Sequence, residues 1–377
     1  MKQFTTIALA MLMAVGMQAQ DKMHIWIDGK AINYPIERVD SVTFSIAGTE
    51  NPDEPINPNP DPDPSTAGGI GVFSIAEGKT VCFAKGNLQF NAVQGAHACA
   101  DGKTRKGTWR FAEHQWDCIG TANENIAETY DGWIDLFGWG TSGYDNTQND
   151  ASAIHFQPWE SSTVSVSNIV MDSVFDPDKE AIRGNGWSYI YYDASYNTYG
   201  YGPSTNMADE GLVGTSANYD WGVFNAISNG GNEVGKWRTL TYREWYYLLA
   251  ERMNAAYLYS QGTVSGVRGC IFLPDNWKLP TGITWTPTAN DYTTNTYTTE
   301  QWATMEAMGA VFLPASGCRY GTVVVTVVTV GISGGRYWSA SCYSESSARY
   351  LIFYADEVNM IYDNRVSGLA VRLVQEL

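Results

Sequence analysis

The pattern of apolar and polar residues along the chain predicts a protein built mainly from short β-strands. Ile25 and Ile27 alternate with polar neighbours, and the Asp28-Gly29 dipeptide that follows them is typical of a tight hairpin turn. Two or three short strands are only marginally stable alone, so we expect this unit, residues 22–46, to pair with a further element.

Short strands are also predicted along the rest of the chain. The phrases Ile-Phe-Leu-Pro at 271–274 and Val-Phe-Leu-Pro at 311–314 are nearly identical, and we expect each to be a buried strand that ends at its proline. Residues 348–353 have the pattern of a core-facing strand, and the β-branched run at 323–330 indicates a buried or edge strand. Further strands are predicted at residues 71–75, 80–83, 87–90, 109–111 and 368–374.

Two segments have helical periodicity instead. Thr241 and Glu244 have the spacing of a capping box, so we expect a helix to begin there, and we expect a second helix to run from about Thr299 to Gly309. A weaker helical pattern covers residues 220–231. Few helices, many short strands and long loops indicate the α+β class. The side chains expected on the buried helix faces are Trp245, Leu248, Leu249 and Arg252 in the first helix and Trp302, Met305 and Met308 in the second.

The start of the chain has the pattern of a secretory signal peptide, which we assign to residues 1–19. Lys2 supplies a positive charge, residues 7–15 are an unbroken run of nine apolar residues, and Ala19 offers a small residue at the cleavage point. Nine apolar residues are too few to cross a bilayer, so no transmembrane segment is expected. We expect the protein to be exported, to the periplasm or to the cell surface.

Three further parts follow the signal peptide. Residues 20–48 form the short N-terminal β unit, and residues 49–68 form a linker in which prolines alternate with acidic residues. Residues 69–377 contain no second linker of this kind, so we expect them to form one large domain.

Composition excludes several classes of function. The chain has 40 acidic and 23 basic residues and a net charge of −17, which argues against nucleic acid or an anionic membrane as a partner. Phosphate-loop, dinucleotide-binding, zinc-protease and serine-hydrolase motifs are absent from the sequence, and only four histidines are present. We therefore expect no enzymatic activity, no metal and no cofactor.

Two weak candidate metal sites have simpler explanations. His114 and Cys118 are four residues apart in a segment with a strand-like pattern, where a hydrogen-bonded structural histidine is favoured. The acidic and amide residues between 145 and 150 could form a calcium loop, but their spacing matches no EF-hand, and a solvated turn is favoured. The six cysteines do not specify a pairing, and several lie in apolar strands that suit buried thiols, so we expect at most one or two disulfide bonds.

A tyrosine-rich segment at residues 184–202 is the clearest compositional sign of a binding surface. It contains six Tyr and four Gly, the residue types that dominate engineered and antibody binding loops. The alternative is an ordered loop that packs on the domain. The candidate ligand contacts in this segment are Tyr191, Tyr196 and Tyr199.

Several phrases of the sequence resemble a known family. They are Trp-Arg-Thr-Leu-Thr-x-x-Glu-Trp at 237–245, Gly-Arg-Tyr-Trp-Ser at 335–339 and Gly-x-x-Val-Arg-Leu-Val at 368–374, with supporting phrases at 87–90 and 109–117. In this order they resemble the Fibrobacter-type major paralogous domain of exported Bacteroidetes proteins. That group is similar to the C-type-lectin-like fold of formylglycine-generating enzymes and of variable proteins diversified by retroelements.

The resemblance implies a C-type-lectin-like domain with short twisted antiparallel sheets, two or three helices and long loops, used as a binding scaffold. Trp338, Gly368 and Arg372 would be scaffold residues. The calcium–sugar motifs of lectins and the close cysteine pair of the oxidases are absent, which argues against both chemistries. The ligand contacts that the resemblance implies are Arg336, Tyr337, Tyr343, Glu345, Arg349, Tyr354, Asp356, Asn359, Tyr362, Asp363 and Asn364.

The sequence therefore predicts an exported, non-enzymatic protein that displays a C-type-lectin-like domain and binds a glycan or surface-protein ligand. The main alternative is a structural or adhesive cell-surface subunit that assembles through residues 22–46 by adding a strand to a neighbouring chain. A third hypothesis, an enzyme that cleaves glycans with paired carboxylates, is less favoured because the segment 184–202 offers only Asp193.

Overall fold

The chain divides into two units, residues 1–58 and 59–377, with the boundary inside the proline- and aspartate-rich segment. Several predicted features lie outside the residues that the structure describes: the signal peptide, nearly all of the linker and the tyrosine-rich segment 184–202. The computed structural model describes residues 22–27, 30–35, 68–125, 129–144, 211–320, 323–325, 334–344, 347–365 and 367–377.

The N-terminal unit contains the predicted hairpin. Strands β1 (Lys22–Ile27) and β2 (Lys30–Pro35) pair antiparallel, with Ile27 opposite Lys30. Two residues, Asp28 and Gly29, separate the paired ends, as the sequence pattern predicts.

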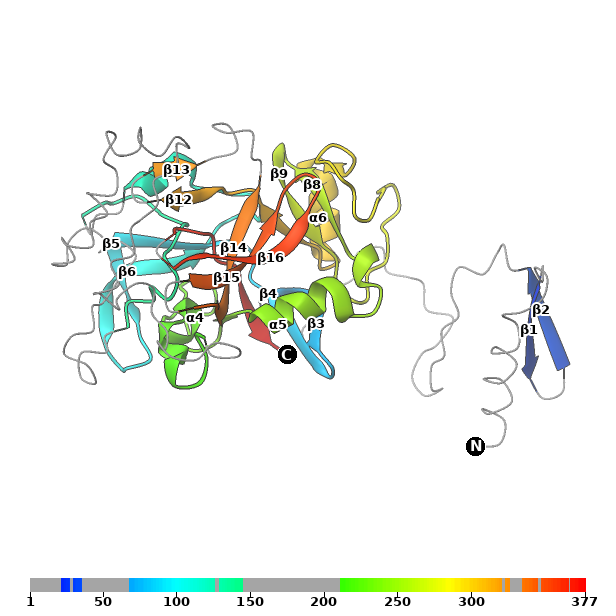
Figure 1. Cartoon of the computed structure of the whole chain (residues 1–377), viewed down its shortest axis with the longest axis horizontal. Helices are drawn as coiled ribbons and strands as arrows, with labels where there is room; N and C mark the ends of the chain where they lie inside the picture. Colours follow the sequence, from blue (N-terminus) through cyan, green and yellow to red (C-terminus); the bar gives the residue numbers. More distant parts are fainter. Residues whose placement is uncertain are drawn as a thin grey trace. The chain divides into compact units, whose positions relative to one another are not determined.

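The larger unit is of the α+β class, with mostly small antiparallel sheets and few helices (Figure 1). One sheet has the strand order β3-β4-β17-β7, so the last strand of the chain pairs with a strand near the start of the unit. In Figure 1 the C-terminus accordingly lies beside β3. The bounds are β3 (Ile70–Ala76), β4 (Lys79–Phe83), β7 (Arg238–Thr239) and β17 (Leu373–Glu376).

A second sheet explains the two nearly identical apolar phrases. Its order is β10-β8-β9-β11, and β9 pairs antiparallel with β11, so that Ile271 lies opposite Phe312 and Cys270 opposite Leu313. All four side chains are fully buried, which confirms the prediction of buried strands. The bounds are β8 (Tyr259–Val264), β9 (Val267–Phe272), β10 (Thr296–Tyr297) and β11 (Val311–Pro314).

A three-stranded antiparallel sheet, β14-β15-β16, carries half of the predicted ligand contacts. Its two faces contact different parts of the core: Trp338 and Tyr350 belong to one cluster of buried residues, and Tyr337 and Leu351 to another. The bounds are β14 (Gly335–Cys342), β15 (Ser347–Phe353) and β16 (Val358–Asn364). Two further pairs are β5 (Leu88–Ala98) with β6 (Thr104–Phe111) and β12 (Cys318–Tyr320) with β13 (Val323–Val325).

Both principal helices begin where the sequence predicts. Helix α5 (Tyr242–Tyr246) has the expected capping box between Thr241 and Glu244 and continues into a π-helical turn, η8 (Tyr247–Glu251). Helix α6 (Thr299–Ala307) ends just before Gly309, whose φ of 93° suits glycine. Met308, which was expected on the buried face of this helix, is only half-buried.

The third predicted helix, over residues 220–231, is wrong in its extent. Helix α4 (Trp221–Phe224) is a single turn capped by Asp220, and residues 225–231 leave the helix because the segment ends in Asn229-Gly230-Gly231, which favours turns. Short 3₁₀ helices are η4 (Gly120–Glu124), η7 (Gly214–Tyr219) and η9 (Ala255–Tyr257). No helix among the described residues is long and apolar enough to span a membrane.

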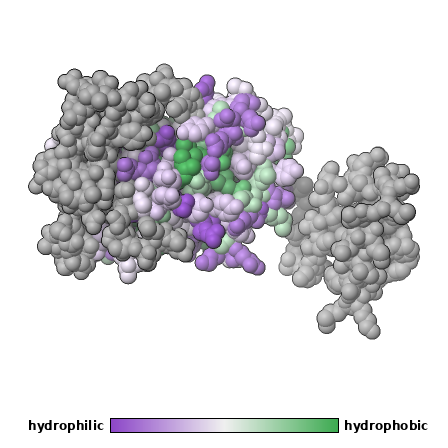
Figure 2. Space-filling view, viewed as in Figure 1, coloured by the Kyte–Doolittle hydropathy of each residue, from purple (hydrophilic) through white to green (hydrophobic). Residues whose placement is uncertain are grey.

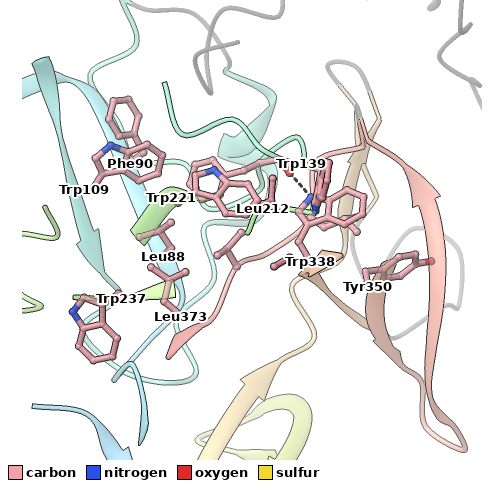
Figure 3. Packing of buried hydrophobic residues seen from close by; sticks show 14 of the residues in the cluster. Leu88, Phe90, Trp109, Trp139, Leu212, Trp221, Trp237, Trp338, Tyr350 and Leu373 are labelled. Atoms are coloured by element: carbon pink, nitrogen blue, oxygen red, sulfur yellow. Dashed lines mark hydrogen bonds between the residues drawn. The ribbon is translucent and has the colours of Figure 1, made fainter. Parts of the chain in front are cut away.

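Tryptophan rings fill much of the core (Figure 3). The ring of Trp109 lies 4.4 Å from that of Phe90, and Trp338 lies edge-on to Tyr350 with centroids 5.8 Å apart. Two of the indole N–H groups donate to the backbone, Trp139 to the carbonyl of Ser339 and Trp338 to that of Phe137.

A buried arginine joins three segments that are distant in sequence. The guanidinium of Arg372 donates to Asn87 Oδ1 at 3.1 Å and to the carbonyls of Ala84 and Phe312 at 3.0 and 2.8 Å. Asn87 in turn donates to the hydroxyl of Tyr337, which donates to the carbonyl of Pro314. Burial lowers the pKa of Arg372 to about 10.

Candidate ligand-binding surface

Five side chains from one helix, two strands and one turn form a continuous series of ring and cation contacts, which we call the tyrosine–arginine stack. In order of contact they are Tyr246 and Tyr242 of α5, Arg349 of β15, Tyr343 just after β14, and Tyr362 of β16. Helix α5 contacts all three strands of the sheet, which brings these side chains together.

The contacts of the stack are close. The rings of Tyr343 and Tyr362 are parallel within 6° with centroids 3.7 Å apart. The Cζ atom of Arg349 lies 5.0 Å from the centroid of the Tyr343 ring and 4.2 Å from that of Tyr242. The rings of Tyr242 and Tyr246 are stacked at 6.3 Å. Such aromatic and cation–π contacts each add about 0.5–1.5 kcal/mol at partly exposed sites.

Local sequence explains why the sheet side of the stack forms. Arg349 and Tyr362 are direct cross-strand partners in the register of β15 and β16, so both project from the same face of the sheet. Tyr343 follows the last residue of β14, and its backbone N–H donates to the carbonyl of Ser347, which closes the turn between β14 and β15.

The helix side is held by an ion pair. Arg238 forms a bidentate contact with Glu244, at 2.9 and 2.7 Å, and the carboxylate of Glu244 also accepts the N–H of Thr241 as part of the capping box. Burial raises the pKa of Glu244, but the hydrogen bonds and charge of Arg238, together with the hydrogen bonds from Thr241, lower it by more, so the net shift is downward. The N–H of Tyr242 donates to Ser341 Oγ of β14 at 3.0 Å. The first turn of α5 is therefore fixed to the sheet.

Both ends of the stack are open to solvent. Tyr246 is 41% exposed, Tyr343 39% and Tyr362 51%, whereas Arg349 between them is half-buried. Figure 2 shows a hydrophobic area where Figure 1 draws β14 and β16, with hydrophilic residues around it. The half-buried apolar side chains of β16 are Val358, Met360 and Ile361.

Most of the other predicted contacts do not gather at this surface. Arg336 and Asp363 lie on the opposite face of the sheet, where Arg336 Nη1 is 3.6 Å from Asp363 Oδ2. Asn359 is on that face too and donates to Glu357. Half-buried Tyr354 and exposed Asp356 lie in the turn between β15 and β16. Asn364, at the end of β16, is half-buried on the same face as Tyr362.

The predicted surface position is wrong for Tyr337. Its side chain is fully buried, and its hydroxyl bonds to Asn87 and Pro314 as described above. The reason is that both faces of β14 are covered, so alternation along the strand does not place a side chain in solvent. Four predicted contacts lie outside the described residues: Glu345, Tyr191, Tyr196 and Tyr199.

Two members of the stack, Tyr242 and Tyr246, were not among the residues that the sequence singled out. Their signal is visible in hindsight, because a pair spaced i, i+4 after a capping box places two rings on one helix face. No local pattern predicts that this helix face contacts Arg349, which lies more than 100 positions later in the sequence.

Little else in the described residues suggests a reactive site. Contrary to the strand-like pattern, residues 113–118 form a turn, in which the His114 ring stacks on Trp116 and its Nδ1 lies 3.3 Å from Asp117 Oδ2. Cys99, Cys118 and Cys270 have free thiols. Across the described ranges, no group of three or more His, Cys, Asp or Glu side chains could hold a metal ion. Burial raises the pKa of Asp135 to about 6, but this carboxyl is buried beneath the surface, bonded to Asn123.

The three phrases that carry the family resemblance meet in the core. Thr239 pairs with Leu373, and the N–H of Trp338 donates to the carbonyl of Ala370, so segments 237–245, 335–339 and 368–374 support one another. Comparison with protein-family models, with curated proteins and with solved structures found no match to this chain.

Proposed function

We propose that this protein is an exported, non-enzymatic ligand-binding protein and that the tyrosine–arginine stack is its binding surface for a glycan or a surface protein. The observation that carries this proposal is the exposure of Tyr246, Tyr343 and Tyr362 on one anchored surface. Tyrosine supplies large contact area and a polar hydroxyl, and a stacked ring loses little rotamer entropy when a ligand covers it.

The anchoring of the stack supports a binding role. Arg349 and Tyr362 stand on paired strands, and Tyr242 is fixed through Ser341 and the capping box of α5. Side chains held by regular elements and by neighbouring contacts are preorganised, so that less binding energy is spent on ordering them.

The same proposal includes the fold family of the large unit and the location of the protein in the cell. We propose that residues 69–377 have a C-type-lectin-like fold of the kind seen in the Fibrobacter-type major paralogous domain, and that the chain acts in the periplasm or at the cell surface. What supports the fold is the α+β class, the small antiparallel sheets and the meeting of the three resembling phrases in one core. What supports the location is the signal-like pattern of residues 1–19.

A binding screen of the full chain against glycan and surface-protein panels tests the proposal. The double variant Tyr343→Ala/Tyr362→Ala should lose at least tenfold in affinity for any hit, because stacked aromatic contacts of about 1–2 kcal/mol are removed. Tyr257→Ala is the matched control, since Tyr257 is 66% exposed and lies outside the stack. A folded protein that binds no panel member, or a hit that survives the double variant, would contradict the proposed site.

The second candidate is a structural or adhesive subunit that assembles through its N-terminal strands. The observation that favours it is the β1–β2 hairpin, a two-stranded sheet in a unit separate from the large domain. Deleting residues 20–48 should abolish self-association in sedimentation experiments while the remaining chain keeps its far-ultraviolet spectrum. Unchanged assembly after the deletion would exclude this candidate.

A further inference from the structure

Arg349 is the one cation within the tyrosine–arginine stack, and aromatic rings hold it in place. The guanidinium contacts the rings of Tyr242 and Tyr343 through their faces. Within the part of the chain that the structure describes, no carboxylate oxygen lies within 4.0 Å of it and its N–H groups have no hydrogen-bond acceptor. A guanidinium whose faces pack against rings keeps the N–H donors at its planar edge available. Two of these donors can form a bidentate pair with a carboxylate.

The charges around the stack also favour an anionic group. The carboxylates on α5 and β16, Glu244 and Asp363, are each ion-paired with an arginine already. Arg243, next to Tyr242 on the helix, is exposed and has no ion pair within the described residues. Among the described side chains of α5, β15 and β16, Arg243 and Arg349 are therefore the charged groups without an ion-pair partner, although the whole chain has a net charge of −17.

An apolar stacking platform lies directly beside this cation. Tyr362 is the cross-strand partner of Arg349, and side chains in such pairs have Cβ atoms about 5 Å apart. One face of the Tyr362 ring is covered by Tyr343, and the side chain is still 51% exposed. A ligand that contacts both Tyr362 and Arg349 has a flat apolar face and, next to that face, a carboxylate about one sugar ring away.

We propose that the tyrosine–arginine stack binds a sugar that carries a carboxylate, a uronic acid or a related acidic sugar. Its ring stacks on Tyr362, and its carboxylate accepts hydrogen bonds from Arg349. This inference rests on the proposed function and specifies the class of its ligand.

The test uses the folded full chain and two matched probes, a trimer of galacturonic acid and the neutral galactose trimer obtained by reducing its carboxyl groups. Calorimetry should show binding of the acidic trimer at least tenfold tighter than that of the neutral one. Arg349→Gln should weaken binding of the acidic trimer at least tenfold and binding of the neutral one much less, because only the acidic trimer loses a charge-assisted hydrogen bond. Arg349→Lys should keep part of the affinity, and Arg268→Gln, which changes an exposed arginine outside the stack, should keep all of it.

The outcomes separate this inference from the proposed function. Equal binding of both trimers, or an Arg349→Gln variant that binds normally, overturns the acidic-sugar assignment and leaves a binding surface for another ligand. Binding of a glutamate-rich peptide, with no binding of the acidic trimer, overturns it in favour of an acidic protein partner. Failure of every glycan and protein probe with a folded chain overturns the proposed function itself.

Discussion

Tyr343 and Tyr362 stack face to face, with ring centroids 3.7 Å apart and planes inclined by 6°. The first lies at the end of β14 and the second on β16, so the contact reaches across the central strand β15, where Arg349 lies opposite Tyr362. This pair therefore links the two outer strands of the sheet at its exposed end. It also leaves both side chains accessible to a ligand, since Tyr343 is 39% and Tyr362 51% exposed.

The stacking contact should be measurable as a coupling energy. We expect the single variants Tyr343→Ala and Tyr362→Ala and their double variant to give a coupling of about 0.5–1.5 kcal/mol in the free energy of unfolding, the usual value for an aromatic pair. Urea denaturation of the four proteins measures it. Strict additivity of the two single effects would show that the rings do not interact in solution.

Arg372 should be far more important for stability than an exposed arginine. Replacing it with Met leaves the carbonyls of Ala84 and Phe312 and the Oδ1 of Asn87 without their donor inside the core. We expect Arg372→Met to lower the free energy of unfolding by about 3 kcal/mol or more, against less than about 0.5 kcal/mol for Arg243→Met on the surface. Thermal and urea unfolding compare the two. Similar small losses of unfolding free energy for both variants would contradict the conclusion that the hydrogen bonds of Arg372 stabilise the core.

The buried position of Tyr337 can be tested separately from binding. Tyr337→Phe removes a hydroxyl that accepts from Asn87 and donates to Pro314. We expect the variant to lose about 1–3 kcal/mol of stability, because two buried polar groups lose their partner, while its affinity for any ligand of the stack is unchanged. Reduced affinity at full stability would instead place Tyr337 at the binding surface.

Asp135 should give the protein a pH-dependent stability. Burial raises the pKa of its carboxyl from 3.8 to about 6, so the folded state holds this proton more tightly than the unfolded state does. The stabilisation is complete below about pH 4 and is lost as the pH rises through 6, by an amount on the order of 2–3 kcal/mol.

Comparison with Asp135→Asn isolates this contribution, since other groups also titrate in the same range. The variant cannot titrate at this position. The free energy of unfolding of the wild type minus that of the variant should therefore fall between pH 4 and 7 and stay constant above pH 7. Urea titrations at half-unit steps of pH measure this difference. A difference that does not change with pH would mean that folding does not raise the pKa of Asp135.

Local patterns were sufficient for most individual elements. The capping box of Thr241 and Glu244, the end of α6 before Gly309 and the pairing of β1 with β2 depend on interactions within a few residues, and all three occur where predicted. Helix α4 is shorter than predicted because a weak periodicity over residues 220–231 competes with the turn preference of Asn229 and the glycines that follow it.

The candidate site was predicted only in part. Tyr343, Arg349 and Tyr362 come together on one face, whereas Arg336 and Asp363 lie on the other face and Tyr337 is in the core. Alternation along a strand separates its two faces but does not say which face meets solvent. Here much of both faces is buried, by two clusters that contain Trp338 on one side and Tyr337 on the other.

The sequence by itself determined the class of the fold, many of the strands and the starts of α5 and α6, because these follow from propensity, periodicity and capping between near neighbours. Only the tertiary structure decided that β9 pairs with β11, that Arg372 joins three distant segments, and that Tyr242 of α5 meets Arg349 of β15. These contacts join residues about 40 to nearly 300 positions apart. They arise from the packing of whole elements against a shared core. Because this packing depends on the shapes of all the elements together, the residue spacing within one segment does not predict it.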